Sequence, residues 1–287
     1  MRYRCIDRRR NRYSVRMMSV ALRVSRSGYY AWRVRPESRR ARRNRELTSI
    51  IRTLHAESAG VYGSPKIHQE LAVAGVLCGR NTVAKLMRQA GLRGCPKKRY
   101  RVKAGGPAGA VVAENLLRQN FHADQINERW VSDITFISTR QGWLYLAVIM
   151  DLYSRRIVGW SMSRRINRHL ALAALNMALG QRELSDRLIH HSDRGAQYLS
   201  DDYQAVLKAH GIRCSMSDRG NCYDNAAVES FFSLLKRERV NRVRYRTRDE
   251  ARADVFDYIE RFYNRQRSHS YLGYTSPVQF EKQAMGT

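Results

Sequence analysis

Three apolar segments follow one another between residues 130 and 162, with short turns between them. Residues 130–138, 143–151 and 155–162 are rich in the β-branched and aromatic side chains that favour strands. Because the turns are short, the pattern predicts an antiparallel meander. Asp133 lies inside the first strand, where aspartate is disfavoured and an unpaired buried carboxylate is costly. The chain is therefore restricted to a sheet-containing fold, and Asp133 requires a functional or ion-paired explanation.

Helices and strands alternate after this meander. The remaining elements are expected in this order: helix 167–180, strand 187–192, helix 200–210, strand 212–216, polar loop 217–223, a helix that carries Glu229, and helix 248–263. A meander followed by alternating helices and strands is typical of a mixed α/β domain.

Positive charge is concentrated in the first 121 residues. They carry 28 Lys and Arg against 6 Asp and Glu, whereas residues 122–287 carry 25 against 19. A strongly basic segment beside a nearly balanced one is expected to bind a polyanion. An anionic membrane is the competing partner, but a surface anchor needs a continuous apolar face, which residues 33–45 lack. Nucleic acid is therefore the favoured partner.

Cysteine usage and hydropathy bear on the compartment. The five Cys are odd in number and form no Cys-x-x-Cys pair, which favours reduced thiols and argues against structural zinc. No apolar run approaches the ~18 residues of a membrane span. No apolar signal segment follows the basic N-terminus. The expected location is the cytoplasm, with no membrane partner.

Residues 61–95 predict a helix-turn-helix. Ser64-Pro65 is typical of a helix start, and apolar residues then recur at helical spacing up to Gly75. A second helix begins near Gly79 after a turn of three to four residues. Its polar face carries side chains that can contact phosphates and base edges: Arg80, Asn81, Lys85 and Arg88. The alternative is a generic two-helix packing unit with a basic surface.

Four parts are expected along the chain: a basic helical arm over 1–60, the helix-turn-helix over 61–95, a basic flexible linker over 96–121, and an α/β domain over 122–287 with a C-terminal helix and tail. Within the arm, 13–34 is expected to be a short helical pair with Ser27 as a cap. The Arg-rich segment 36–46 is either a solvated helix face or a surface that tracks phosphates.

Two further acids accompany Asp133. Asp193 stands where a strand ends and a loop begins, the usual place for ligand-binding residues in α/β sheets. Glu229 follows after 35 intervening residues, on a helix that carries Lys236 two turns further on. Three carboxylates could hold Mg²⁺ or Mn²⁺, hard cations that prefer oxygen ligands. Two such ions can clamp the attacking and leaving oxygens of a phosphoryl displacement.

Each acid also has an ordinary explanation. Asp133 could be a salt-bridged core acid, Asp193 a turn residue before Arg-Gly, and Glu229 a surface residue stabilised by the helix dipole. His190 and His191 could join the metal or contact DNA, although such a pair is more often half core and half surface. A Tyr or Ser nucleophile is the alternative chemistry for cutting DNA.

The motifs around these acids resemble those of bacterial insertion-sequence transposases with a retroviral-integrase-like DDE core. The matching segments are 24–32, 62–68, 130–135 (Trp-Val-Ser-Asp-Ile-Thr), 191–198 (His-Ser-Asp-Arg-Gly-Ala-Gln-Tyr), 224–236 and the tail over 263–277. The similarity covers nearly the whole chain, and in particular it is to the second-frame protein of the two-reading-frame insertion sequences.

This resemblance implies a ribonuclease-H-like integrase core, with a mixed five-stranded sheet flanked by helices, joined to the N-terminal basic helical region. It implies that Asp133, Asp193 and Glu229 are catalytic residues and ligands of Mg²⁺ or Mn²⁺, with two ions bound. Such enzymes cleave the ends of the element and transfer the freed 3′-hydroxyl into target DNA without a covalent protein–DNA intermediate.

The resemblance also implies partners. Lys236 and Asn225 match family positions and Lys66 lies in a matching segment, so all three are expected to contact DNA, with Asn225 in a positioning role. Double-stranded DNA, as terminal repeats and as target, is the expected partner of a homo-oligomer in the bacterial nucleoid, together with the upstream-frame product. Two other functions stay open: a DNA-binding regulator without catalysis, and a nuclease that only hydrolyses.

Overall fold

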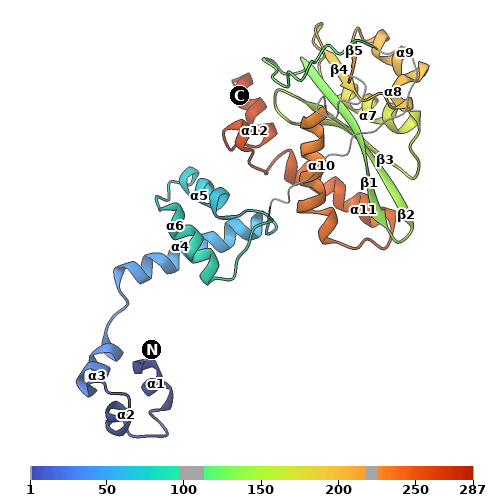
Figure 1. The fold of residues 1–287 in the computed structure, drawn as a ribbon. Coiled ribbons are helices and arrows are strands. Elements are labelled where there is room, and N and C mark those ends of the chain that lie inside the picture. The colour runs from blue at the N-terminus through green and yellow to red at the C-terminus, as the bar shows by residue number, and fades with distance from the viewer. Residues whose placement is uncertain (1, 97–112, 218–224, 287) are drawn as a thin grey trace.

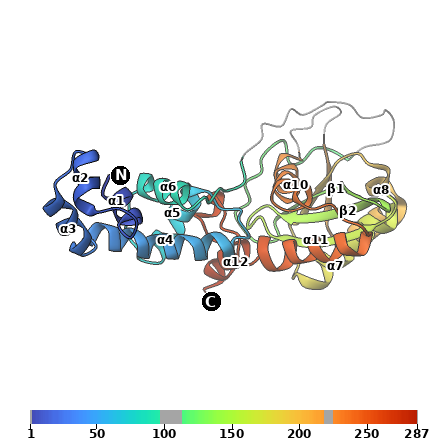
Figure 2. The same cartoon turned by 90° about the horizontal axis from the view of Figure 1, so that it is seen from below.

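The computed structural model describes residues 2–96, 113–217 and 225–286. The predicted linker over 96–121 and the predicted loop over 217–223 fall largely in the two gaps, outside the described residues. The chain is elongated, with the first three helices at one end and the sheet at the other (Figures 1 and 2).

A five-stranded mixed sheet forms the centre of the second half. β1 (Arg129–Thr139), β2 (Gly142–Asp151) and β3 (Ile157–Ser163) form an antiparallel meander, and β4 (Ile189–Ser192) and β5 (Arg213–Met216) extend it in parallel. The strand order is β3-β2-β1-β4-β5. The predicted meander and the predicted mixed five-stranded sheet are both confirmed.

The two edges of β1 differ. β1 pairs with β2 from Trp130↔Asp151 to Thr139↔Gly142, but its register with β4 ends at Val131↔His191. Within the described residues, β1 therefore has no strand partner on the β4 side beyond that point. Asp133 lies at the start of this open edge.

Helices cover the sheet because alternate strand residues point to opposite faces. One core cluster joins Trp130 and Ile149 to α7 (Arg168–Gln181), α8 (Ala196–Leu199) and α9 (Asp201–Ala209). Gly159 on β3 permits the close approach of α7, since a Cβ there would collide with the backbone carbonyl of Ala174 and with Ala178.

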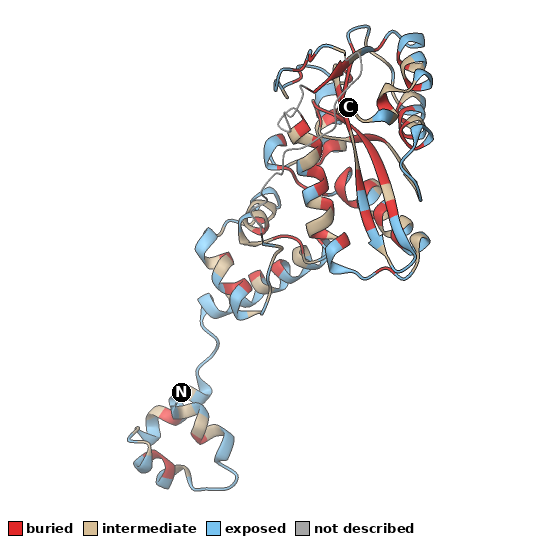
Figure 3. Cartoon of the chain, turned by 45° about the vertical axis from the view of Figure 1, so that its right-hand side comes forward, coloured by how far each residue is buried: buried red, intermediate tan, exposed pale blue. Residues whose placement is uncertain are grey.

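The other core cluster joins Val131 and Val148 to α10 (Ala226–Glu238) and α11 (Arg248–Phe256). Figure 3 shows the buried positions concentrated along the strands and α10. The predicted helix over 248–263 is confirmed as α11 continued by the π-helical turn η3 (Asp257–Tyr263).

Short elements complete the C-terminal region. They are the 3₁₀ turns η2 (Val240–Arg242) and η4 (Ser270–Leu272), and α12 (Pro277–Met285). Asn264 binds the tail to β3, because its side chain accepts from the backbone N–H of Ile157 and donates to the Ile157 carbonyl, both at 3.0 Å. No helix in the described part of the chain is long and apolar enough to cross a membrane.

The N-terminal arm begins with a small helical bundle. α1 (Arg2–Arg9), α2 (Val15–Ala21) and α3 (Arg26–Val34) pack around Ile6 and Tyr29. The helical pair expected over 13–34 is confirmed as α2 and α3, whereas α1 was not predicted.

The predicted cap of α3 was wrong by two positions. Ser25 has extended backbone and its hydroxyl accepts from the Gly28 N–H at 3.2 Å, which makes it the N-cap. Ser27 is already inside the first helical turn, where its hydroxyl bonds that of Ser25.

Three helices, and not the two that were predicted, form the helix-turn-helix region. α5 (Ser64–Val73) and α6 (Arg80–Gln89) are joined by residues 74–79, a longer connection than the three to four residues expected. α4 (Arg39–Glu57) packs on both of them, burying Leu47 and Ile51. The Arg-rich beginning of α4 remains largely exposed.

A buried ion pair lies where the C-terminal tail meets the rest of the core. Arg267 donates to the carboxylate of Glu238 at 2.8 and 2.7 Å, and the Tyr258 hydroxyl donates to it at 2.8 Å. Burial raises the pKa of Glu238, but the hydrogen bonds and charge of Arg267 outweigh this and hold it below its ordinary value. Beside this pair, the Lys66 ammonium of α5 donates to the Ser268 carbonyl at 2.8 Å, which attaches the helix-turn-helix to the tail.

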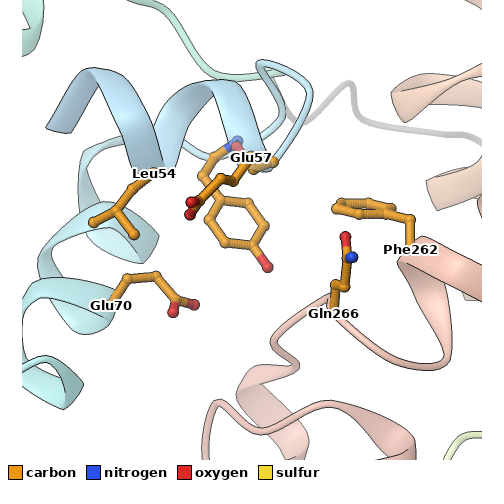
Figure 4. Close-up of a pocket in the computed structure, with 7 residues that line it drawn as sticks. Leu54, Glu57, Glu70, Phe262 and Gln266 are labelled. Atoms are coloured by element: carbon orange, nitrogen blue, oxygen red, sulfur yellow. The ribbon is translucent and has the colours of Figure 1, made fainter. Parts of the chain in front are cut away.

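A cavity of about 420 Å³ lies at the same junction, between α4, α5 and η3 (Figure 4). Its lining residues are Leu54, Glu57, Ser58, Tyr62, Glu70, Phe262 and Gln266. Two of these side chains are acidic and none is basic, so the cavity is unsuited to bind phosphate.

We expect Glu238→Gln to lower the free energy of unfolding by roughly 3–5 kcal/mol, because Arg267 would keep a buried charge without its partner. Urea unfolding at pH 7 measures this loss. Asp249→Asn, which removes an exposed ion pair with Arg252, serves as the control and should change stability by less than about 1 kcal/mol. Equal effects of the two substitutions would contradict the importance of the buried pair.

Candidate active site

Asp133 is the central acid of the site. It lies partly buried on the open edge of β1, and its Oδ1 accepts the backbone N–H of Ile134 at 2.7 Å. Burial, followed by the charges of Asp193 and Glu229, raises the pKa of Asp133 to about 8. The Ile134 hydrogen bond and the charge of Lys236 act in the opposite direction.

Asp193 directly follows the last residue of β4. Its Oδ1 accepts the Gly195 N–H at 2.9 Å, which fixes the turn leading into α8. A Cβ at Gly195 would meet the ends of the Asp193 and Gln197 side chains, so a larger residue there would displace the carboxylate from its present position. Burial raises the pKa of Asp193, and the Gly195 hydrogen bond opposes that rise. The predicted turn and the predicted position at a strand end therefore occur together.

Glu229 comes from the first turn of α10, on a partly buried side of the helix. Burial raises its pKa. Lys236 lies two turns further along α10, and its Nζ is 4.6 Å from the centroid of the Phe136 ring. Burial lowers the pKa of Lys236, while the charge of Asp133 raises it.

The fold thus brings three acids from β1, the end of β4 and α10 into one electrostatic environment. Within the described residues, none of the three forms an ion pair. The salt-bridged alternative for Asp133 therefore finds no support among these residues. In the same part of the chain, no group of three His, Cys, Asp or Glu side chains is arranged to hold a metal ion as it stands. Like charges without a counter-ion favour separation, which is consistent with this open arrangement.

His190 and His191 are both buried in the sheet. The Nε2 atom of His190 bonds the Tyr203 hydroxyl at 3.0 Å, and Nδ1 of His191 bonds the Ser215 hydroxyl at 2.8 Å. Burial lowers the pKa of His190 to about 3. The suggestion that this pair joins the metal or contacts DNA was wrong, because both rings are enclosed by protein.

Two residues expected to contact DNA form hydrogen bonds within the protein. Asn225 is buried at the start of α10, and its Nδ2 donates to the Ser132 carbonyl at 3.1 Å on the open edge of β1. Lys66 donates to the Ser268 carbonyl, and burial lowers its pKa to about 7. Each side chain donates one hydrogen bond within the protein, and the DNA contacts of both stay predictions.

The predicted DNA-binding face of α6 is exposed. In the described part of the chain, no ion pair or hydrogen bond occupies the side chains of Arg80, Asn81, Lys85 and Arg88. Val83, Leu86 and Met87 face the core on the opposite side of the helix. This division of α6 is the one that the sequence pattern predicted.

We expect the metal-free protein to lose stability between about pH 4 and pH 8. The pKa of Asp133 rises on folding from its ordinary value of 3.8 to about 8, so in this range the folded chain holds a proton that the unfolded chain releases. The penalty is absent below pH 4 and complete above about pH 8. Urea unfolding in EDTA should show a smaller decline for Asp133→Asn than for the wild type. Parallel curves for the two proteins would contradict the raised pKa.

Family models match three parts of the chain. An HTH-like domain matches residues 42–100, and integrase core domain models match residues 123–222 and 229–285. The first match includes α4 to α6, and the other two cover the sheet, α10 and the C-terminal region.

Curated relatives are similar over almost the full length. The transposase InsF for insertion sequence IS3A of Escherichia coli K12 is 44% identical over 284 residues, covering 98% of each chain. An uncharacterized 31 kDa protein of insertion element IS600 from Shigella sonnei is 42% identical over 259 residues, covering 90% of this chain and 95% of its own.

Solved structures of retroviral integrases are more distantly similar. The HTLV-2 integrase catalytic core domain, determined in complex with magnesium, is 15% identical with a TM-score of 0.44, covering 56% of this chain and 99% of that one. A simian T-cell lymphotropic virus intasome in complex with a PP2A regulatory subunit is 14% identical with a TM-score of 0.44, covering 80% and 73%.

Proposed function

This chain belongs to the insertion-sequence transposases of the IS3 type, and from that premise we propose that Asp133, Asp193 and Glu229 are its catalytic residues. The enzyme is a DDE phosphoryltransferase that cleaves DNA and transfers strands through an integrase core. The observation that carries the proposal is the convergence of the three acids from β1, the end of β4 and α10, where none of them forms an ion pair among the described residues. This combination leaves negative charge that a bound cation would neutralise.

The donor set fits a hard divalent cation, because all three side chains offer carboxylate oxygens. We propose Mg²⁺ or Mn²⁺ as the cofactor, with two ions bound. When bound, such ions supply charge neutralisation for the attacking and leaving oxygens of a phosphoryl displacement. Since no three ligands stand ready around one point in the described chain, we propose that rotation of these side chains accompanies metal binding.

Other residues of the core would position the DNA and the acids. Lys236 places its ammonium near Asp133 and can neutralise a phosphate of the strand being cut. Asn225 holds the start of α10 against β1, which sets the position of Glu229 four residues later. Gly195 permits the turn in which Asp193 is held.

The basic first half would bind DNA. We propose that α6 enters the major groove and presents Arg80, Asn81, Lys85 and Arg88 to base edges and phosphates. The division into parts at 1–60, 61–95, 96–121 and 122–287 also stays a proposal. The packing of α4 on α5 and α6 favours placing α4 with the helix-turn-helix and not with the arm.

We further propose that the enzyme works as a homo-oligomer on DNA in the bacterial nucleoid. An insertion element has two ends, and each end presents its own phosphodiester bond, so two active sites acting together suit the reaction. The upstream-frame product of the element is a second proposed partner.

Incubation with Mn²⁺ and a labelled terminal-repeat duplex tests the proposed reaction. The expected products are a strand with a freed 3′-hydroxyl and a joined product in added target DNA. Cleavage without joining would instead favour a nuclease that only hydrolyses. Specific binding without cleavage would favour a DNA-binding regulator.

A further inference from the structure

Two large aromatic side chains are exposed together on the β1–β2 hairpin. Phe136 is 52% exposed and Trp143 is 49% exposed. Their rings meet edge to face, with centroids 5.0 Å apart and an interplanar angle of 81°. In the register of the hairpin, Phe136 faces Tyr145 and Trp143 is two residues away on the same side of the sheet.

The rest of that side of the sheet is covered. Trp130, Ala147 and Ile149 on the same face are buried in the core cluster with α7. Phe136 and Trp143 extend beyond this cover, so their apolar surface stays in water. Aromatic side chains bury a large area when they pack, so leaving this pair exposed forgoes considerable stabilisation. A partner that covers the rings would recover it.

Basic groups surround the pair. The Lys236 ammonium lies 4.6 Å from the centroid of the Phe136 ring, and the Arg248 guanidinium donates to the Trp143 carbonyl at 3.0 Å. The segment 244–248 runs along the tip of the hairpin, because the Arg140 N–H donates to the Tyr245 carbonyl at 3.1 Å.

Three further basic side chains nearby are free to bind an anion. Among the described residues, the exposed side chains of Arg140, Arg244 and Arg246 have no hydrogen bond or ion pair. Of the acids at the start of α11, Asp249 pairs with Arg252, while Glu250 accepts the backbone N–H of Arg246 and keeps its charge, so basic groups remain in excess. The surface therefore combines aromatic rings with uncompensated positive charge.

We propose that Phe136 and Trp143 form a stacking platform for an unpaired base of the DNA strand that enters the active site. This inference rests on the proposed function, because it takes Asp133 as part of the reaction centre. Phe136 follows Asp133 by three residues along the open edge of β1, about 10 Å at 3.3 Å per residue, with the two side chains on opposite faces of the strand. Lys236 links the two, since its charge acts on Asp133 while its ammonium lies over the Phe136 ring.

An unpaired base fits this surface better than the other candidates. Proteins hold single-stranded nucleic acid by combining aromatic rings, on which nucleobases stack, with basic side chains that neutralise the phosphates. Bases inside a duplex have both faces stacked on their neighbours, so only an unpaired base offers a face. A second copy of this strongly basic chain would bring positive charge against the five basic side chains around the pair, which are Arg140, Lys236, Arg244, Arg246 and Arg248. This repulsion disfavours self-association at this surface.

Photocrosslinking of the full chain to a thymidine 12-mer containing 5-iodouracil tests where the unpaired base binds. Anisotropy measurements with the same 12-mer at 200 mM salt test how much the two rings contribute to the affinity. The higher salt reduces the contribution of the basic arm. We expect crosslinks at Phe136 or Trp143, and about a fivefold or greater loss of affinity in Phe136→Ala and in Trp143→Ala, equivalent to at least about 1 kcal/mol per stacked base. Trp143→Phe should retain most of the affinity.

A second Phe–Trp pair supplies a matched control. Phe256, 50% exposed, contacts Trp160 at 5.9 Å between centroids, but Trp160 donates to Glu260 and so this pair has acidic surroundings. Phe256→Ala should change the affinity less than twofold. Crosslinks confined to other aromatic residues, or equal losses in Phe256→Ala and Phe136→Ala, would overturn the proposal.

The assay contains EDTA and requires no cleavage, so failure of the three-acid site would not alter its result. Conversely, a negative result here would leave metal-dependent cleavage by the wild type intact.

Discussion

Asp133→Asn is expected to reduce the rate of DNA cleavage by at least about 10³-fold while leaving the folded protein at least as stable as the wild type. The substitution removes an ionisable oxygen donor from the metal site, and a catalytic ion supplies several kcal/mol of transition-state stabilisation, at tenfold in rate per 1.36 kcal/mol. Stability should not fall, because Asp133 is a partly buried carboxyl that is repelled by two other acids and forms no ion pair among the described residues. A neutral amide relieves that repulsion.

Single-turnover cleavage of a terminal-repeat duplex in Mn²⁺, together with urea unfolding at pH 7.5, measures both parts of this prediction. Asp186→Asn is the matched control, since Asp186 is exposed in the turn before β4 and bonds to nothing in the described chain. It should leave the rate within about twofold. A rate for Asp133→Asn within tenfold of the wild type would contradict the catalytic assignment, and a large loss of stability would indicate a structural role.

DNA binding is expected to weaken by about 10³-fold or more between 50 and 200 mM salt. A protein that neutralises 6–10 phosphates releases as many counter-ions, and the logarithm of its affinity falls with a slope of about −0.9 per contact. The first 121 residues supply the charge, with 28 Lys and Arg against 6 acids. The exposed face of α6 should account for part of the slope.

Replacement of Arg80, Lys85 and Arg88 together by Ala should therefore flatten the slope by about 2–3. The control is Arg261→Ala, because Arg261 is exposed but pairs with Asp257 on the same helix. Anisotropy titrations at four salt concentrations measure the slopes. A flat response of the wild type would exclude phosphate contacts as the main source of affinity. An unchanged slope in the triple variant would remove α6 from the interface.

Most of the α/β architecture could be predicted from local pattern. The three strands of the meander have continuous apolar sequences with short turns, and α10 has apolar residues at helical spacing. The N-terminal region was harder to predict. α1, with the sequence RYRCIDRR, contains four basic side chains and one acid in eight residues, and only Ile6 is buried. Its order depends on packing against α2 and α3, which no local pattern reveals.

The three acids were proposed as a site because Asp133 lies inside a strand, Asp193 follows a strand end, and the motifs around all three resemble those of a known family. The positions of Lys66 and Asn225 could not be predicted, since their hydrogen-bond partners, Ser268 and Ser132, are 202 and 93 residues away in the sequence. Two features of the sequence also indicate the exposed aromatic pair of the hairpin. Phe136 and Trp143 stand near the turn of a predicted hairpin, and an Arg-rich segment at 242–248 is present in the sequence.

The most direct test of the account is the binding of Mn²⁺ itself, followed by electron paramagnetic resonance as the free ion disappears. The wild type, with DNA present, is expected to bind the ion saturably at neutral pH, and the variant Asp133→Asn, Asp193→Asn, Glu229→Gln is expected to lose that binding. Saturable binding of equal strength and stoichiometry in both proteins would show that these three acids do not hold the metal.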